Sequence, residues 1–340
     1  MNRRTFLVGS AALAGCSRDR RPRLNVFNWS DYIDPRTVPK FEAEYDVRVR
    51  YGIYESNEEM LARVFGGNSG WDIVFPTDYI VGPLRTQNLL APVDRSLLSN
   101  LDHLEPRFQQ PDWDPRLEWS VPYMVIAAGI AYNKSLAPPP TAWSDLWSQR
   151  LARRMTMLDD PFDVMAACLK RLGESVNATD TGQLRAAQRL AIAQKPLLRA
   201  YLNAEVRDQL VSGDVLAAHM WNTTAQQAID ASPNIAFVYP SEGYAVYPDC
   251  AVILRESRRA ELAHKFINFL LRPEIAAANA LAARTTTTNA AARKIFPPAF
   301  RDNTVLYPPA EVIARGEWAR ATPPDTQRLR DRLWTEIKSA

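Results

Sequence analysis

Apolar and polar residues alternate along the chain with two different periods, and this alternation predicts an α/β fold. In "VRVRYGIY", residues 47–54, every second position is apolar, which is the period of a half-buried strand. Val38, Phe41 and Tyr45 lie three and four residues apart, which is the spacing of one helix face. The predicted strands cover residues 23–29, 47–54, 71–76, 154–158, 215–221, 234–240 and 250–254, and the predicted helices cover 35–45, 56–67, 161–173, 181–194, 258–273 and 326–338. The β-α-β-α-β order at the start predicts a parallel sheet covered by helices.

Length and charge narrow the class of protein. A chain of 340 residues suits two lobes of about 150 residues each. Hydrophobic residues make up 46% and charged residues 23%, which is typical of a soluble globular protein. With 41 basic and 38 acidic residues the chain has no polycationic character, so its charge gives no support to nucleic-acid binding.

The first residues, "MNRRTFLVGSAALAGC", predict an export signal. Arg3 and Arg4 precede an apolar run over 6–14 that is too short to span a bilayer. The paired arginines resemble a twin-arginine signal, and "LAGC" resembles the lipobox of bacterial lipoproteins. The resemblance implies that residues 1–15 are removed, that Cys16 carries a lipid, and that 16–23 form a polar tether. The remaining chain is then close to neutral, with 39 basic residues (41 less Arg3 and Arg4) and 38 acidic ones.

Several kinds of catalytic chemistry have no motif in the chain. There is no G-x-S-x-G elbow, no Walker A loop and no dinucleotide-type G-x-G-x-x-G. His103, His219 and His264 lie more than forty residues from one another and near no cysteine pair, so neither a metal nor another cofactor is expected. Cys168 sits in "MAACLKRL", which is typical of a buried helix face, although a nucleophilic role for it stays open. Whether Cys168 pairs with Cys250 also stays open.

Carboxylates and aromatic residues instead recur at the ends of predicted strands. Trp29, Asp31 and Tyr32 follow "LNVF"; Thr77, Asp78 and Tyr79 follow "WDIVFP"; Asp160 and Asp163 follow "RMTML"; Trp221 and Asn222 follow "VLAAHM"; Tyr247 and Asp249 precede "CAVIL". In open α/β sheets, ligands bind outside the carboxyl ends of the strands, so these side chains are expected to converge.

The residue types in this set favour a cationic ligand. Aromatic faces attract ammonium groups by ~0.5–2 kcal/mol per ring, and carboxylates form charge-assisted hydrogen bonds with N–H donors. A linear polyamine combines separated ammonium groups with methylene spacers that suit the rings, whereas an anion would be repelled. Each element also has a local explanation: Asp160 and Asp163 fit the first turn of a helix behind Pro161, Trp221 fits a core, and Tyr247 with Asp249 fits a turn.

Several longer segments resemble one known family. "FNWSDYI", "YGIYESNEEM", "WDIVFPTDYIV", "SVPYM", "AWSDLW", "LAAHMWN", "FINFLLRPEIA", "NAAARK" and "GEW" are similar to the periplasmic spermidine/putrescine-binding proteins of polyamine ABC transporters, in family order over about residues 24–318. The resemblance implies a two-lobed periplasmic-binding-protein type II fold with the ligand in the interlobe cleft. It implies one lobe from 24–125 plus 249–292 and another from 126–248 plus 293–340. It further implies a monomer in the periplasm or cell envelope that delivers its ligand to an ABC permease without chemistry on it.

The resemblance also implies roles for individual residues. Trp29, Asp31 and Tyr32 match a first cleft segment and Thr77 with Tyr79 a second; Asp160 and Asp163 match a pair that holds a terminal amine; Trp221 matches a cleft ring; Tyr247 stands where the family usually has tryptophan; Asp249 matches the carboxylate for the inner or second amine.

The chain departs from the family at three further positions. Thr285 stands where a cleft tyrosine is usual, Ala319 replaces a glutamine, and Asp78 adds a carboxylate. A diamine, a triamine, agmatine or another guanidino compound therefore all remain possible ligands, as does an enzyme on this scaffold with Cys168 as nucleophile.

Overall fold

The computed structural model describes residues 19–340. The strands are β1 Arg23–Trp29, β2 Arg48–Tyr54, β3 Ile73–Val74, β4 Val121–Asn133, β5 Met155–Met157, β6 Leu198–Tyr201, β7 Ala217–Trp221, β8 Ile235–Val238, β9 Tyr244–Ile253, β10 Thr286–Thr287 and β11 Gly316–Trp318. The α-helices are α1 Thr37–Tyr45, α2 Asn57–Phe65, α3 Asp78–Thr86, α4 Pro106–Gln109, α5 Pro161–Arg171, α6 Thr181–Gln194, α7 Val206–Ser212, α8 Asn222–Ala231, α9 Ala260–Leu270, α10 Pro273–Ala283, α11 Ala290–Lys294, α12 Pro298–Arg301, α13 Ala310–Ile313 and α14 Pro324–Ser339. The predicted export signal and Cys16 lie outside the described residues.

Each predicted helix and strand is present, several with the expected start signal. The Ser56 side chain accepts a hydrogen bond from the Glu59 backbone N–H at 3.1 Å and begins α2. The Asp160 side chain caps α5 in the same way, with Pro161 at the first helical position. Within residues 19–340 no helix is both long and apolar enough to cross a membrane.

The sheet is mixed, so the prediction of a parallel sheet is only partly right. β1 pairs in parallel with β2 and β3, and β5 pairs in parallel with β6 and β7. β9, however, runs antiparallel to β3 and β4, and β4 runs antiparallel to β7. The main strand order is β2-β1-β3-β9-β4-β7-β5-β6. The two long antiparallel strands β4 and β9 therefore join the two parallel parts.

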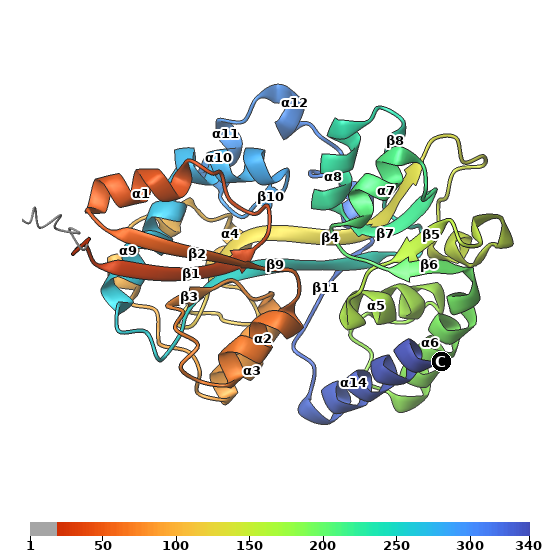
Figure 1. Cartoon of the computed structure of the whole chain (residues 1–340), viewed down its shortest axis with the longest axis horizontal. Helices are drawn as coiled ribbons and strands as arrows, with labels where there is room; N and C mark the ends of the chain where they lie inside the picture. The colour runs from red at the N-terminus through yellow and green to blue at the C-terminus, as the bar shows by residue number, and fades with distance from the viewer. Residues whose placement is uncertain (1–18) are drawn as a thin grey trace, which may run out of the picture.

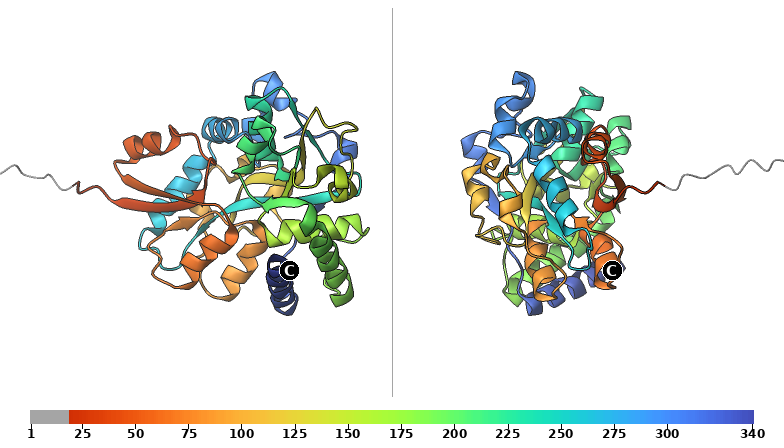
Figure 2. Two further views of the ribbon diagram at one scale, coloured as in Figure 1. Left: turned by 45° about the vertical axis from the view of Figure 1, so that its right-hand side comes forward. Right: turned by 90° about the vertical axis from the view of Figure 1, so that its left-hand side faces the viewer.

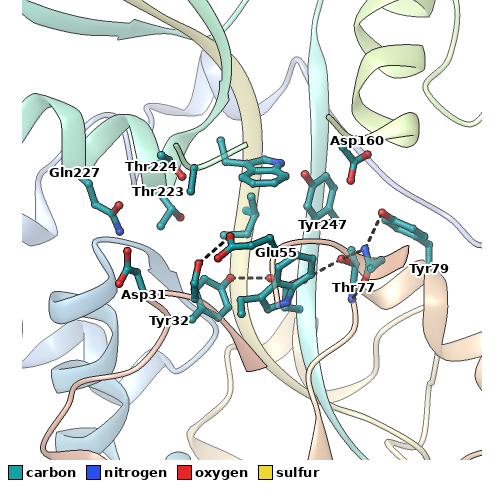
Figure 3. A pocket seen from close by; sticks show the side chains of 17 residues that line it. Asp31, Tyr32, Glu55, Thr77, Tyr79, Asp160, Thr223, Thr224, Gln227 and Tyr247 are labelled. Atoms are coloured by element: carbon teal, nitrogen blue, oxygen red, sulfur yellow. Dashed lines mark hydrogen bonds between the residues drawn. The ribbon is translucent and has the colours of Figure 1, made fainter. Parts of the chain in front are cut away.

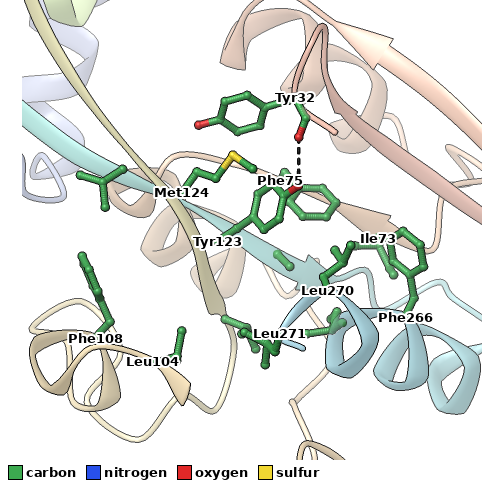
Figure 4. Close-up of a cluster of buried hydrophobic side chains, with 14 of the residues drawn as sticks. Tyr32, Ile73, Phe75, Leu104, Phe108, Tyr123, Met124, Phe266, Leu270 and Leu271 are labelled. Carbon is green, nitrogen blue, oxygen red and sulfur yellow. Dashed lines mark hydrogen bonds between the residues drawn. The ribbon is translucent and has the colours of Figure 1, made fainter. Parts of the chain in front are cut away.

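The helices cover both sides of this sheet and bury several clusters of apolar side chains against it. Figure 1 shows β4 and β9 through the middle of the molecule, with helices on either side of each half, and the turned views in Figure 2 show the same layering. One buried cluster joins β1, α1, β9 and α9, and a second joins β5, α5, α6 and α14. Figure 4 shows part of the first, where the Tyr123 hydroxyl donates to the Tyr32 carbonyl at 2.9 Å. The molecule thus has two lobes bridged by shared strands.

One segment near the C-terminus bears on the lobe boundaries. Phe296, Phe300 and Leu306 fall in the predicted second lobe but share a buried cluster with Ala276 and Ala280 of α10, which falls in the predicted first lobe. The boundaries themselves stay a prediction.

Candidate functional site

A cleft with about 660 Å³ of space open to solvent lies at the junction of the two lobes. Nine of the predicted site residues line it: Trp29, Asp31, Tyr32, Thr77, Tyr79, Asp160, Trp221, Tyr247 and Asp249. The remaining lining residues were not predicted from the sequence; they are Ser30, Glu55, Asn57, Ile126, Ala204, Thr223, Thr224 and Gln227. Among residues 19–340, the lining includes four carboxylates and no lysine, arginine or histidine. This composition favours a cation over an anion.

Strand ends and helix starts bring these side chains together, with one exception. Trp29 ends β1, Thr77 precedes α3, Asp160 precedes α5 and Trp221 ends β7. Tyr247 and Asp249 were expected just before a strand, but they lie inside β9. The two-residue period of a strand puts both on one face, toward the cleft.

Asp249 lines the cleft and is held by two hydroxyl groups. Tyr32 donates to its Oδ2 at 2.7 Å and Thr77 donates to its Oδ1 at 3.0 Å. Burial raises the pKa of Asp249 to about 7, and the two hydrogen bonds oppose that rise. A cation here would restore the ionised form.

Asp160 and Asp163 form an acidic pair in the first turn of α5. The Asp163 N–H donates to Asp160 Oδ1 at 2.9 Å. Tyr247 and Trp221 donate to Asp163 Oδ2 at 2.6 and 2.8 Å, whereas Asp163 Oδ1 is buried without a hydrogen-bond partner. Burial raises the pKa of both carboxyls, and the charge of Asp163 raises that of Asp160 further. The unpartnered oxygen is a site where an N–H donor would be strongly favoured.

Aromatic rings form part of the cleft lining. The Trp29 indole N–H donates to the Phe75 carbonyl at 2.7 Å, which fixes the ring at the end of β1. The Tyr79 ring stacks on Phe162 with centroids 4.8 Å apart, and the Tyr247 ring meets the Tyr79 ring edge-on. These rings are held in place before any ligand arrives.

The end of the cleft opposite Asp160 is polar and more open. Figure 3 places Asp31, Gln227 and Thr223 there, away from Asp160 and Tyr79. Asp31 has a φ of 50°, a left-handed conformation that aspartate tolerates in turns, and 69% of its side chain is exposed. Arg207 of α7 approaches it at 3.8 Å, which is a weak, exposed ion pair.

Three predicted site residues do not line the cleft. Asp163 lies just behind the wall and acts on it through Tyr247 and Trp221. Thr285 is fully buried and accepts a hydrogen bond from Thr223 at 2.8 Å. Asp78 is buried and lines a different pocket, together with Ala319.

The missed residues divide into two kinds. Glu55 and Asn57 belong to "YESNEEM", so a polar pair directly after β2 was a signal that the sequence offered. Thr223 and Gln227 come from α8, a helix that the sequence analysis did not predict.

Both cysteines that the structure describes are buried and free. Burial raises the pKa of the Cys168 thiol to about 12. Within residues 19–340 no group of three or more His, Cys, Asp or Glu side chains is placed to hold a metal ion.

Comparisons with known proteins agree with this architecture. The model of the family "Bacterial extracellular solute-binding protein" matches residues 37–305. The chain is 32% identical to the spermidine/putrescine-binding periplasmic protein of Escherichia coli K12, over 93% of this chain and 92% of the relative. It is 30% identical to the putrescine/cadaverine-binding protein of Pseudomonas aeruginosa, over 99% of both chains.

Solved structures give the same result. The TpPotD lipoprotein of Treponema pallidum superposes with a TM-score of 0.82 at 30% identity, over 93% of this chain and 99% of that one. The spermidine/putrescine ABC transporter substrate-binding protein PotD of Streptococcus pneumoniae superposes with a TM-score of 0.80 at 27% identity, over 94% and 99%. The chain therefore belongs to the bacterial extracellular solute-binding proteins and has their two-lobed type II fold.

Proposed function

We propose that this protein captures a linear polyamine, spermidine or putrescine, in its cleft and delivers it to an ABC importer. The observation that carries the proposal is that, in the part of the chain that the structure describes, the lining has four carboxylates and no basic side chain, beside a buried Asp163 oxygen that lacks a partner. Removing a carboxylate from water without a counter-charge is costly, so this cleft favours a ligand that supplies cationic N–H donors. The relatives whose names state spermidine, putrescine or cadaverine support the same ligand class.

The order of groups along the cleft supports a linear shape for the ligand. Carboxylates are spread along the length of the cleft, with Asp31 toward one end, Asp160 toward the other and Glu55 between them. Asp249 and the rings of Trp29, Trp221 and Tyr247 lie along the wall as well. Ammonium groups would meet the carboxylates, and methylene spacers would rest on the ring faces.

The transport role extends the proposal beyond the cleft. Residues 1–15 would direct export, Cys16 would carry a lipid anchor, and the mature protein would act as a monomer outside the cytoplasm next to its permease. No step of chemistry on the ligand is proposed. The alternative nucleophile, Cys168, is a buried thiol in a helix core rather than a cleft residue, and its raised pKa keeps it protonated.

Calorimetry tests the proposal directly. The soluble form lacking residues 1–16 is titrated with putrescine, spermidine, spermine and agmatine at near-physiological salt. We expect saturable binding of at least one polyamine and recovery of the ligand unaltered by mass analysis. Absence of heat with all four compounds would refute polyamine binding, and a preference for agmatine would assign the cleft to a guanidino cation.

A further inference from the structure

A second pocket lies behind the strands that form the cleft wall. It has about 990 Å³ of space open to solvent, and we call it the back pocket. In β9, Tyr244 and Val246 line the back pocket whereas Tyr247 and Asp249 line the cleft, as the two-residue period of a strand requires. Ile126 of β4 lines both. The two pockets therefore share the bridging strands β4 and β9, which Figure 1 shows at the centre of the molecule.

The charge of the back pocket is opposite to that of the cleft. Its lining contains three arginines, Arg107, Arg293 and Arg301, against a single carboxylate, Asp302. Arg107 and Arg293 share one partner outside the lining, Glu105, at 3.0 and 3.2 Å. Two guanidinium groups thus face one carboxylate, which leaves a positive charge uncompensated. Each guanidinium has five N–H donors, so most of their donors are still free for another acceptor.

The two guanidinium groups, on side chains that are 46% and 39% exposed, lie over aromatic rings that restrict their motion. Arg107 lies over the rings of Phe108 and Trp318 at 4.6 and 5.3 Å, and Arg293 lies over the ring of Tyr307 at 4.5 Å. A restrained guanidinium loses less entropy when it binds an anion, which is the arrangement that favours bidentate contacts to phosphate or carboxylate.

The back pocket also exposes large apolar side chains. Ile313 is 53% exposed and Trp318 is 37% exposed, and both line it together with Tyr239 and Tyr307. A concave site that combines exposed apolar surface with a few convergent polar groups is typical of an organic ligand rather than a simple ion.

We propose that the back pocket binds a small organic anion with phosphate or carboxylate groups on an apolar body, and that this anion favours the closed form of the cleft. The two lobes are in contact in this structure, since Tyr79 of α3 stacks on Phe162 of α5 and Asn203 donates to the Glu55 carbonyl at 3.4 Å. A rotation about β4 and β9 that opens the cleft narrows the space behind them. An anion that fits the present back pocket therefore binds the closed form better and raises polyamine affinity by linkage. The claim that the anion raises polyamine affinity rests on the proposed function.

The first experiment measures the anion site without any polyamine. Ligand-free protein is titrated by calorimetry with phenyl phosphate and with phthalate, which separate the phosphate and carboxylate sources, against sodium chloride of equal ionic strength. We expect one of the two to bind with a Kd on the order of 1 mM or tighter. Failure of both probes to bind up to tenfold above that concentration would overturn the site.

Variants assign the binding to the arginines. Arg107→Gln/Arg293→Gln should weaken binding of the probe at least tenfold. Arg301→Gln should weaken it less, because the exposed ion pair of Arg301 is with its neighbour Asp302 and the pairs with Glu105 stay intact. The matched control is Arg85→Gln/Arg185→Gln, two exposed arginines on α3 and α6, and it should leave binding unchanged. Circular dichroism and spermidine affinity without probe report that each variant is folded. Equal binding of the probe by wild type and by Arg107→Gln/Arg293→Gln would overturn the assignment.

The last measurement tests the coupling between the two pockets. Saturating probe should lower the spermidine Kd of wild type about threefold. The probe should leave the spermidine Kd of Arg107→Gln/Arg293→Gln unchanged. This comparison controls for pairing of the anion with spermidine in solution. An unchanged or raised spermidine Kd would overturn the coupling. Probe binding with no polyamine binding would leave the anion site standing and refute the proposed function instead.

Discussion

At the scale of single residues, Asp249 is a buried carboxylate in the cleft lining, and one substitution isolates the effect of its charge. Asp249→Asn keeps the shape of the side chain and an acceptor for Tyr32 or Thr77. It removes the charge that an ammonium group would meet, and hydrogen bonds to charged groups contribute roughly 1.5–3 kcal/mol. We expect spermidine and putrescine affinity to fall at least tenfold by calorimetry.

Asp78 offers a matched control for this experiment. It is also buried, burial also raises its pKa, and it accepts a hydrogen bond from the Tyr79 N–H at 2.8 Å, which an asparagine oxygen can accept as well. Because it lines another pocket, Asp78→Asn should leave affinity within about twofold of wild type. If the two substitutions had equal effects, Asp249 would serve the fold rather than the ligand.

His219 is a single residue that should govern stability in acid. It is fully buried on β7, neither ring nitrogen has a hydrogen-bond partner, and its ring meets Trp143 edge-on. Burial lowers its pKa to about 3, so the unfolded chain binds a proton there before the folded one does. The stability that follows from this shift is present above pH 6.5 and is lost as the pH falls toward 3.

The substitution His219→Leu removes this titration. Between pH 7.5 and pH 4.5, urea unfolding should show wild type losing about 3 kcal/mol more than the variant, from the pKa difference between the two states. Equal losses would mean that the imidazole is hydrated or paired in solution.

The first turn of α5 is an element whose two carboxylates predict a pH-dependent interaction with the ligand. Burial raises the pKa of Asp160 and Asp163, as it does that of Asp249, so part of this set is protonated near pH 6.5 in the ligand-free protein. A cation stabilises the ionised forms, so binding should release on the order of one proton at pH 6.5. Titrations in two buffers of different ionisation enthalpy measure this release, and identical heats would contradict it.

The same raised carboxyl pKa values determine how the Tm increase caused by spermidine changes with pH. A raised carboxyl pKa stabilises the ligand-free fold below the unfolded value near pH 4, and that contribution is lost as the pH rises through about 7. The increase in Tm caused by spermidine should therefore grow from pH 5.5 to pH 8. Asp163→Asn should flatten this dependence.

At the level of elements, the sequence predicts those whose residues follow one clear period. β1 has the expected bounds, and the caps of α2 and α5 form as Ser56 and Asp160 predict. β4 was missed because it is buried on both faces and lacks alternation, and α3 was missed because Gly82 and Pro83 lie inside it. The antiparallel course of β9 depends on pairing between distant segments, which local periodicity does not encode.

The same distinction explains the candidate site. Strand-end carboxylates and rings such as Trp29 and Asp160 were predictable, because convergence at strand ends follows from the fold class. Thr223 and Gln227 were not, because their helix was not predicted. Asp78 has the same local context as Thr77 and Tyr79, and only the start of α3 turns its side chain to the other side.

At the scale of the whole molecule, we expect contact between the lobes to contribute part of the binding energy. The Tyr79–Phe162 stack joins α3 of one lobe to α5 of the other, and Phe162 does not line the cleft. Substitution of Phe162 should therefore act on closure rather than on any one ligand.

Phe162→Ala should weaken spermidine and putrescine binding by the same factor, about threefold to tenfold, since an aromatic pair contributes roughly 0.5–1.5 kcal/mol beyond its buried area. Small-angle scattering should show that saturating spermidine compacts wild type, and that the variant needs proportionately more ligand for the same compaction. A factor that differed between the two polyamines would place Phe162 in direct contact with the ligand. An unchanged affinity would mean that the lobes close without the stack.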